Sequence, residues 1–127
     1  VYGGENEAGP ILQPLQREVT VRDLLTHTSG LTYHWLEYGP VEEMYRQAKV
    51  SNNKPLAEFV ADLLKQPLAF QPGTNWRYSF SHDVVAYLIE IISGKTVYNF
   101  LKTNLFDPLS MTDTAYYVPA AKLDRLA

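Results

Sequence analysis

Apolar residues recur at helical spacing in several stretches of the chain, most clearly in residues 55–67. The apolar positions there fall at i, i+3, i+4, i+7 and i+8, with charged residues on the opposite face. They are Leu56, Phe59, Val60, Leu63 and Leu64. Pro55 suits the first turn and Pro67 ends the pattern, because proline lacks an amide hydrogen and restricts the residue before it. This stretch predicts an amphipathic helix.

Residues 71–94 combine a turn, a polar segment and an apolar run. Pro72 and Gly73 predict a tight turn, because proline presets one backbone angle and glycine permits a positive one. Ser81 is a suitable N-cap and Gly94 a suitable C-terminal stop. The apolar positions between them form a broad stripe, which predicts a mostly buried helix. They are Val84, Val85, Ala86, Leu88, Ile89, Ile91 and Ile92.

Three shorter helices are predicted from their start and stop signals. Thr20, with Asp23 three residues on, resembles a capping box and predicts a helix to about Thr26. Pro40 begins a helix through about residue 48. Thr96 caps a helix that ends before residue 108. The inward positions of the helix that begins at Pro40 are Val41, Met44, Tyr45 and Ala48.

The two ends of the chain predict little regular structure. Residues 1–18 carry turn signals and two prolines, which indicate a short hairpin or an extended lead-in. Residues 114–118 predict a short strand, and Pro119 begins what resembles another helix. No internal repeat is present. We therefore expect a mainly α fold with short β pieces near both ends, in a single helical unit spanning residues 1–127.

Composition narrows the choice of partner and cofactor. A formal net charge of -3 and a charged content of 20% do not favour a nucleic-acid or membrane partner, and no apolar run approaches the roughly 20 residues that span a bilayer. The absence of cysteine excludes disulfides, thiolate metal sites and a cysteine nucleophile. His27, His34 and His82 lack the spacing of a zinc site. We expect neither a metal nor a cofactor.

Tyr78 and Ser79 lie on the polar turn that precedes the predicted helix at Ser81. Such a turn is either a rigid position for chemistry or a capped loop with a tyrosine packed at its edge. Ser79, Ser81, His82 and Asp83 also suggest a local catalytic triad, but neighbours at a helix start point in different directions. Capping and the helix dipole explain Ser81 and Asp83 better.

Residues 31–38 are rich in aromatic side chains and show no clean period. The aromatic residues there, Tyr33 and Trp35 among them, either line a pocket for an apolar ligand or cover the core. The polar segment before them, residues 27–30, is expected to form a turn in which Gly30 supplies backbone freedom. We assign this segment no catalytic role.

Several separate stretches resemble one known family. They are residues 19–31 (VTVRDLLTHTSGL), the turn from Pro72 to Tyr78-Ser79, the helix closing on Ser93-Gly94, and residues 106–114 (FDPLSMTDT). Together they resemble the serine β-lactamase-like hydrolases, and among these most closely the family VIII carboxylesterases and class C β-lactamases. The resemblance implies a two-part enzyme with its active site between an α/β part and a helical part. This chain is then expected to be the helical subdomain of the β-lactamase/transpeptidase-like fold.

The resemblance also implies a mechanism. Members attack a carbonyl with the serine of a Ser-x-x-Lys motif, and the tyrosine of a Tyr-x-Asn-type motif helps to move the proton. Tyr78 matches that tyrosine. The Ser-x-x-Lys helix of such families precedes a stretch like residues 1–31, so we expect the nucleophile upstream of Val1. The chain is then a fragment, inactive alone, that packs on the missing α/β part of its own parent chain.

The resemblance and its departures suggest a substrate class. Phe80 stands where the family motif usually has asparagine, which favours an esterase over an efficient β-lactamase. A small-molecule ester or a β-lactam is the expected substrate. Phe80, Tyr33, Trp35 and Trp76 are the expected substrate-binding residues. Two alternatives stay open: a β-lactamase or D,D-peptidase of the same family, and a non-catalytic homologue that binds a peptide or a partner.

Overall fold

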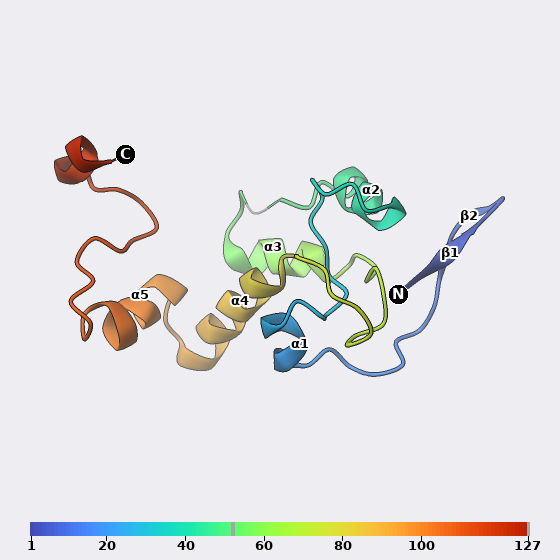
Figure 1. Ribbon diagram of the computed structural model, residues 1–127, viewed down its shortest axis with the longest axis horizontal. Coiled ribbons are helices and arrows are strands. Elements are labelled where there is room, and N and C mark those ends of the chain that lie inside the picture. Colours follow the sequence, from blue (N-terminus) through green and yellow to red (C-terminus); the bar gives the residue numbers. More distant parts are fainter. Residues whose placement is uncertain (52, 127) are drawn as a thin grey trace. The chain divides into compact units, whose positions relative to one another are not determined.

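The computed structural model describes residues 1–51 and 53–126. The chain forms two compact units, Val1–Tyr87 and Leu88–Ala127, and the boundary between them falls within one helix. The fold is mainly helical with a two-stranded sheet at the N-terminus, as predicted (Figure 1). Its elements are β1 (Tyr2–Asn6), β2 (Gly9–Leu12), α1 (Val21–Leu25), α2 (Pro40–Gln47), α3 (Leu56–Leu63), α4 (Ser81–Ser93), α5 (Val97–Leu101), the π-helical η1 (Lys102–Phe106) and the 3₁₀ helix η2 (Ala120–Arg125).

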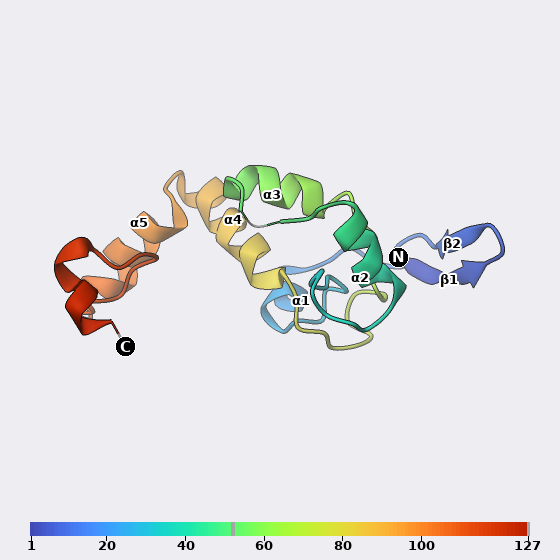
Figure 2. The same ribbon diagram turned by 90° about the horizontal axis from the view of Figure 1, so that it is seen from above.

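The N-terminal segment forms the hairpin, one of the two expected alternatives, with β1 antiparallel to β2 (Figure 2). Helix α1 follows and carries a complete capping box. The Thr20 side chain accepts from the Asp23 amide, and the Asp23 carboxylate accepts from the Thr20 amide. The prediction of a short capped helix at this position is confirmed.

Helices α2 and α3 begin and end close to the predicted residues, but their inward faces are narrower than expected. Val41 and Tyr45 of α2 are buried, whereas Ala48 is exposed. On α3, Phe59, Val60 and Leu63 are buried, whereas Leu64 is 66% exposed. The inward assignments of Ala48 and Leu64 were therefore wrong. Both residues are the C-caps of their helices, where the apolar stripe turns away from the core.

The core of the unit Val1–Tyr87 joins α2 and α3 to the loops around them. The Tyr45 hydroxyl donates to the carbonyl of Pro67, and the Phe59 ring packs edge-on against Phe80 just before α4. Its buried apolar members are Leu24, Leu31, Tyr33, Val41, Tyr45, Val50, Phe59, Val60, Leu63, Phe80 and Val84.

Helix α4 has the predicted limits but not the predicted burial. Gly94 ends it with a positive φ of 66°, and its amide donates to Glu90. Only Ser81 and Val84 are buried, whereas Ile91 and Ile92 are 59% and 83% exposed. The prediction of a mostly buried helix was wrong, because no described segment covers the later turns of its apolar stripe.

In the unit Leu88–Ala127, the prediction of a helix cap is confirmed and the prediction of a strand is wrong. Thr96 caps α5 by accepting from the Asn99 amide, and η1 extends the helical path to Phe106. Residues 114–118 form no strand and bend at residues 116–117, because no segment of the described chain pairs with them. Residues after Pro119 form η2, so the predicted helix start is present.

In the described part of the chain, no single helix has the length and apolar character needed to cross a membrane. Helix α4 and residues 97–106 have sufficient length and apolar character only when they are taken together, and a bend of 78° separates them. Within the same residues, no three histidine, aspartate or glutamate side chains gather where a metal ion would fit.

Candidate active site

Backbone hydrogen bonds hold the segment 27–30 beside the segment that leads to Tyr78. The amides of Ala69, Gly73 and Arg77 donate to the carbonyls of Gly30, Thr28 and His27, at 2.7, 2.8 and 2.9 Å. Gly30 has a φ of 88°, and a Cβ there would lie 2.4 Å from the carbonyl oxygen of Phe70. Only glycine permits this approach. The pairing brings His27 close to Tyr78, 51 positions later in the sequence.

Two ion pairs flank the turn that carries Tyr78. Arg17 forms a bidentate pair with buried Asp23 at 2.7 and 2.8 Å, and this hydrogen bonding holds the pKa of Asp23 far below its usual range. Arg77 donates to the fully buried Glu42 at 2.8 Å, and Thr32 donates to the same carboxylate oxygen. The Arg77–Glu42 pair therefore fixes the turn to α2. The Arg17–Asp23 pair fixes the segment before α1 to that helix and places the Arg17 guanidinium beside Gly73 of the turn.

Tyr78 and five other rings form what we call the aromatic cluster. The Tyr78 ring centroid lies 4.9 Å from that of His27 and 5.0 Å from that of Tyr33. Tyr33 in turn stacks on Trp35 at 4.0 Å, and Trp76 lies edge-on to His27 at 6.2 Å. The members of the cluster are His27, Tyr33, Trp35, Trp76, Tyr78 and Phe80.

The members of the aromatic cluster differ in exposure: three of the rings are exposed and two are buried. Tyr78, Trp35 and Trp76 are 52%, 52% and 60% exposed, whereas Phe80 is fully buried and Tyr33 nearly so. Burial, followed by the neighbouring Tyr78 hydroxyl, raises the pKa of Tyr33. Tyr33 thus stays a neutral phenol, and Tyr78 is the more exposed tyrosine of the two. The five predicted site residues, Tyr78, Phe80, Tyr33, Trp35 and Trp76, all belong to this one cluster.

Three fully buried serine hydroxyls lie under the aromatic cluster. Ser81 Oγ lies 2.8 Å from Ser29 Oγ and 2.7 Å from Ser79 Oγ, and Ser79 Oγ lies 3.3 Å from His27 Nδ1. Ser81 is the first residue of α4, and its hydroxyl joins this network instead of capping the helix as predicted. The imidazole that meets Ser79 comes from His27 and not from His82, so the residues 79–83 form no local triad.

Two features of the site had no part in the sequence expectations. Glu42 is buried, and its spacing of three residues from inward-facing Tyr45 could have placed it on the buried face of α2. The partnership of His27 with Ser79 and Tyr78 left no such local signal, because it joins residues more than fifty positions apart.

Ser51 and Lys54 stand at the Ser-x-x-Lys spacing, which the expectation of an upstream nucleophile overlooked. They lie in the loop between α2 and α3. Ser51 Oγ accepts from the Asn53 amide at 3.2 Å, and Lys54 pairs with Asp62 at 2.6 Å. Among the described residues, Ser51 and Lys54 have no side-chain hydrogen bond to the aromatic cluster, so these two residues do not make the serine–lysine–tyrosine contacts that the chemistry needs.

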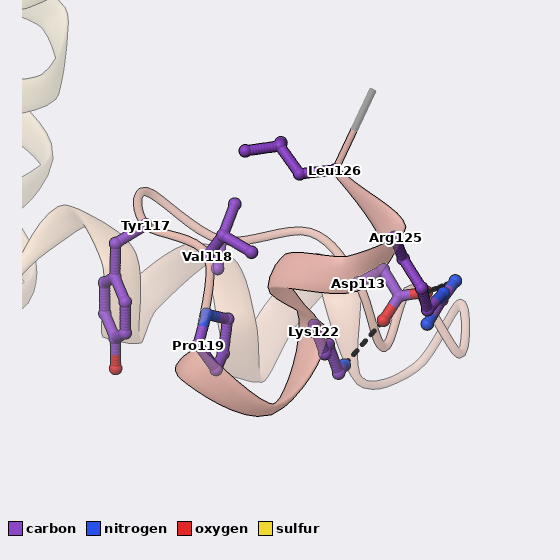
Figure 3. Close-up of a pocket in the computed structure, with 8 residues that line it drawn as sticks. Asp113, Tyr117, Val118, Pro119, Lys122, Arg125 and Leu126 are labelled. Carbon is purple, nitrogen blue, oxygen red and sulfur yellow. Dashed lines mark hydrogen bonds and ion pairs between the residues drawn. The ribbon is translucent and has the colours of Figure 1, made fainter.

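A separate pocket of about 180 Å³ lies in the unit Leu88–Ala127. Figure 3 shows Lys122 and Arg125 facing Asp113 on one side of it, with the apolar side chains on the other. Hydrogen bonds from Lys122, then from Arg125, lower the pKa of Asp113 to about 2. Because both cations are paired with Asp113 and no member of the aromatic cluster lines this pocket, we assign it no part of the site.

Comparison with known proteins gives a consistent result. The beta-lactamase family profile matches residues 10–127. Lovastatin esterase from Penicillium rubens is 35% identical over 115 residues, which are 91% of this chain and 28% of that protein. Esterase EstB from Burkholderia gladioli is 35% identical over 103 residues, 77% of this chain and 26% of that protein. The solved structure of EstCE1, a hydrolase with promiscuous acyltransferase activity, matches with a TM-score of 0.65 at 26% identity, over 72% of this chain and 25% of that one.

These relatives are enzymes of one class, esterases and acyltransferases with the β-lactamase fold. The chain belongs to the beta-lactamase family. The resemblance expected from residues 19–31, the Tyr78 turn and residues 106–114 is thereby confirmed. The chain spans less than a third of the length of these relatives, at 28%, 26% and 25%.

Proposed function

We propose that this chain is the helical part of a serine esterase and that Tyr78 is its proton-transferring residue. The observation that carries the proposal is the placement of Tyr78. Its side chain is half exposed on a turn that the Arg77–Glu42 ion pair fixes to α2, and its ring lies against the buried ring of Tyr33. A hydroxyl that is both accessible and rigidly held suits general acid–base chemistry.

The proposed reaction begins with a serine outside this chain. Its hydroxyl oxygen adds to the ester carbonyl carbon as its proton passes to Tyr78, and the same proton then protonates the departing alkoxide as the ester C–O bond breaks. The water oxygen next bonds to the acyl carbon as a water proton passes to Tyr78, and this proton then returns to the serine oxygen as the acyl–serine C–O bond breaks. A tyrosine has an ordinary pKa of about 10, so it needs a nearby cation to act as a base near neutral pH. The motif lysine, also outside this chain, is proposed to supply that charge.

The aromatic cluster supports an ester in preference to a β-lactam. Phe80 occupies the third motif position and is fully buried, so no side-chain amide reaches the site from there. Trp35 and Trp76 present exposed apolar surface beside Tyr78, which suits an apolar acyl group. Tyr33 and Phe80 would act on the substrate by supporting these rings from below.

The rest of the parent protein is the proposed partner of this chain. Large apolar side chains such as Ile91 and Ile92 are exposed on α4. An α/β part of the same parent would cover such a surface, because exposed apolar area of this kind is usually an interface. The isolated chain, without that part, is expected to be inactive.

The test compares the full-length protein with its Tyr78→Phe variant on a p-nitrophenyl ester and on a chromogenic β-lactam. We expect ester hydrolysis to exceed β-lactam hydrolysis, and kcat for the ester to fall ~100-fold or more in the variant, as for loss of general acid–base catalysis. Tyr116→Phe is the matched control, because Tyr116 is an exposed tyrosine outside the aromatic cluster. Equal losses in the two variants would refute the role of Tyr78.

A fluorophosphonate label then locates the nucleophile. After reaction of the full-length protein, mass analysis of the peptides should place the adduct on a serine upstream of Val1, followed three residues later by lysine. An adduct on Ser51, Ser79 or Ser81 would show that the nucleophile lies within this chain and would overturn the proposed division.

Acyl transfer is a second candidate, favoured by the match to EstCE1. In that case an alcohol, not water, accepts the acyl group from the same acyl-enzyme. Adding a primary alcohol to the ester assay distinguishes the two. A new ester product would indicate transfer, and release of the acid alone would indicate hydrolysis.

A further inference from the structure

The buried serines form a hydrogen-bonded chain that ends on His27. In order, the chain is Ser29, Ser81, Ser79 and the Nδ1 atom of His27, with steps of 2.8, 2.7 and 3.3 Å. All three serines are completely buried. Each hydroxyl must therefore place its proton on a protein acceptor, because a buried donor without a partner loses its hydrogen bonds to water and gains none in return.

The available donors and acceptors favour one direction of proton donation along the serine hydroxyls. The Leu31 amide donates to Ser29 Oγ, so the Ser29 proton has Ser81 Oγ as its one acceptor among the described residues. Ser81 must then donate to Ser79, and Ser79 to Nδ1 of His27. If Nδ1 instead carried a proton and donated it to Ser79, every later donation would reverse. The Ser29 hydroxyl proton would then have no acceptor among the described residues. Nδ1 is therefore the acceptor, and the imidazole proton resides on Nε2.

We propose that His27 is a positioning residue for Tyr78: a neutral imidazole, fixed as its Nε2–H tautomer by the three buried serines, that backs the Tyr78 ring. The catalytic consequence rests on the proposed function, whereas the tautomer does not. Positioning matters here because a displacement of about 1 Å at a catalytic group can cost ~100-fold in rate.

The surroundings of His27 fit a rigid support. Its φ of 56° lies in the left-handed region, which non-glycine residues rarely adopt, and its carbonyl accepts from the Arg77 amide. The centroid of its ring lies 4.9 Å from that of Tyr78 and 4.5 Å from that of His82.

The groups around His27 also keep it neutral. Burial, followed by the charge of His82, lowers the pKa of His27. The titratable groups facing it are Tyr78 on the turn and His82 on α4, with half-buried Asp83 next to His82.

Nuclear magnetic resonance tests the tautomer directly. In the full-length protein labelled with ¹⁵N-histidine, we expect the His27 spectrum at neutral pH to show a protonated Nε2 and an unprotonated Nδ1. Ser79→Ala removes the donor to Nδ1 and should yield a mixture of tautomers. Ser29→Ala leaves the Ser81–Ser79–His27 steps in place and should not change the tautomer. A protonated Nδ1 in the unmodified protein would overturn the proposal, whether or not the protein is an esterase.

Ester kinetics test the positioning role. In His27→Asn the shorter amide can still accept from Ser79 and tolerates a positive φ, but the ring that backs Tyr78 is lost. We expect kcat to fall ~10- to 100-fold with little change in KM. His82→Asn, which removes a neighbouring ring outside the serine chain, should reduce kcat far less. A kcat for His27→Asn equal to that of His82→Asn would refute positioning. If the unmodified protein shows no ester hydrolysis, the proposed function is refuted, but the tautomer result still stands.

Discussion

The buried pair between Arg77 and Glu42 offers the sharpest test of how the Tyr78 turn is held. The Glu42 side chain is completely buried, and that of Arg77 is 20% exposed. In Arg77→Met the apolar stem is kept, but Glu42 is left with Thr32 as its remaining donor on one oxygen and no partner on the other. Removing one member of a buried pair in this way costs about 3–5 kcal/mol of stability.

Loss of the cation–π contacts adds to that cost. Arg77 also lies over the rings of Tyr38 and Phe70, at 4.9 and 5.7 Å, and each such contact contributes about 0.5–2 kcal/mol. The dominant cost is the uncompensated carboxylate. Adding Glu42→Gln to Arg77→Met should therefore restore part of the lost stability, because a neutral amide replaces the buried charge.

Urea unfolding of the full-length protein, followed by fluorescence, measures these differences. Lys65→Met is the control, because Lys65 is 70% exposed in its pair with Asp62 and such surface pairs contribute less than about 1 kcal/mol. The reasoning is refuted if Arg77→Met costs no more than Lys65→Met, or if the double variant is less stable than Arg77→Met alone.

Two further predictions concern pH and glycine. Because Arg17 lowers the pKa of Asp23 in the folded protein, the stabilisation is complete above the ordinary value of 3.8 and declines as the pH falls below it. In a series of unfolding experiments, Asp23→Asn should therefore lower stability at neutral pH and flatten the acid dependence. Unchanged acid dependence would contradict this. Gly30→Ala should destabilise the protein more than Gly94→Ala does, since both have positive φ but a Cβ clashes with backbone only at Gly30. Equal shifts in Tm would show that the clash is relieved.

Local signals in the sequence predicted most of the fold. Prolines and caps gave the starts of α1, α2, α3 and α5, and Gly94 gave the end of α4. These features depend on backbone groups within one turn, so a single sequence contains the information. The strand predicted at residues 114–118 failed because a strand also needs a partner, which the local pattern does not reveal.

The five candidate site residues were named from the sequence, and the structure brings them into one cluster, but the contacts that support Tyr78 were not predicted. Tyr78 was named because its turn resembles a short family motif, and the neighbouring aromatic residues were candidates either for a pocket or for the core. His27, Glu42 and Ser29 reach Tyr78 only through contacts across 35 to 52 positions. Hydrogen bonds between such distant residues leave no period or spacing in a sequence. The expected burial of α4 failed for a related reason, since an apolar stripe does not say which segment covers it.

The charged and polar groups around Tyr78 carry no uncompensated positive charge, and this bears on the proposed chemistry. The two arginines that flank its turn are both committed to carboxylates, Arg17 to Asp23 and Arg77 to Glu42. The imidazole behind its ring is inferred to be neutral. These groups can fix the position of the tyrosine, but they add no uncompensated positive charge that would favour its phenolate. If Tyr78 acts as a base near neutral pH, the charge that makes it one must therefore come from outside these supports, as the proposed lysine would provide.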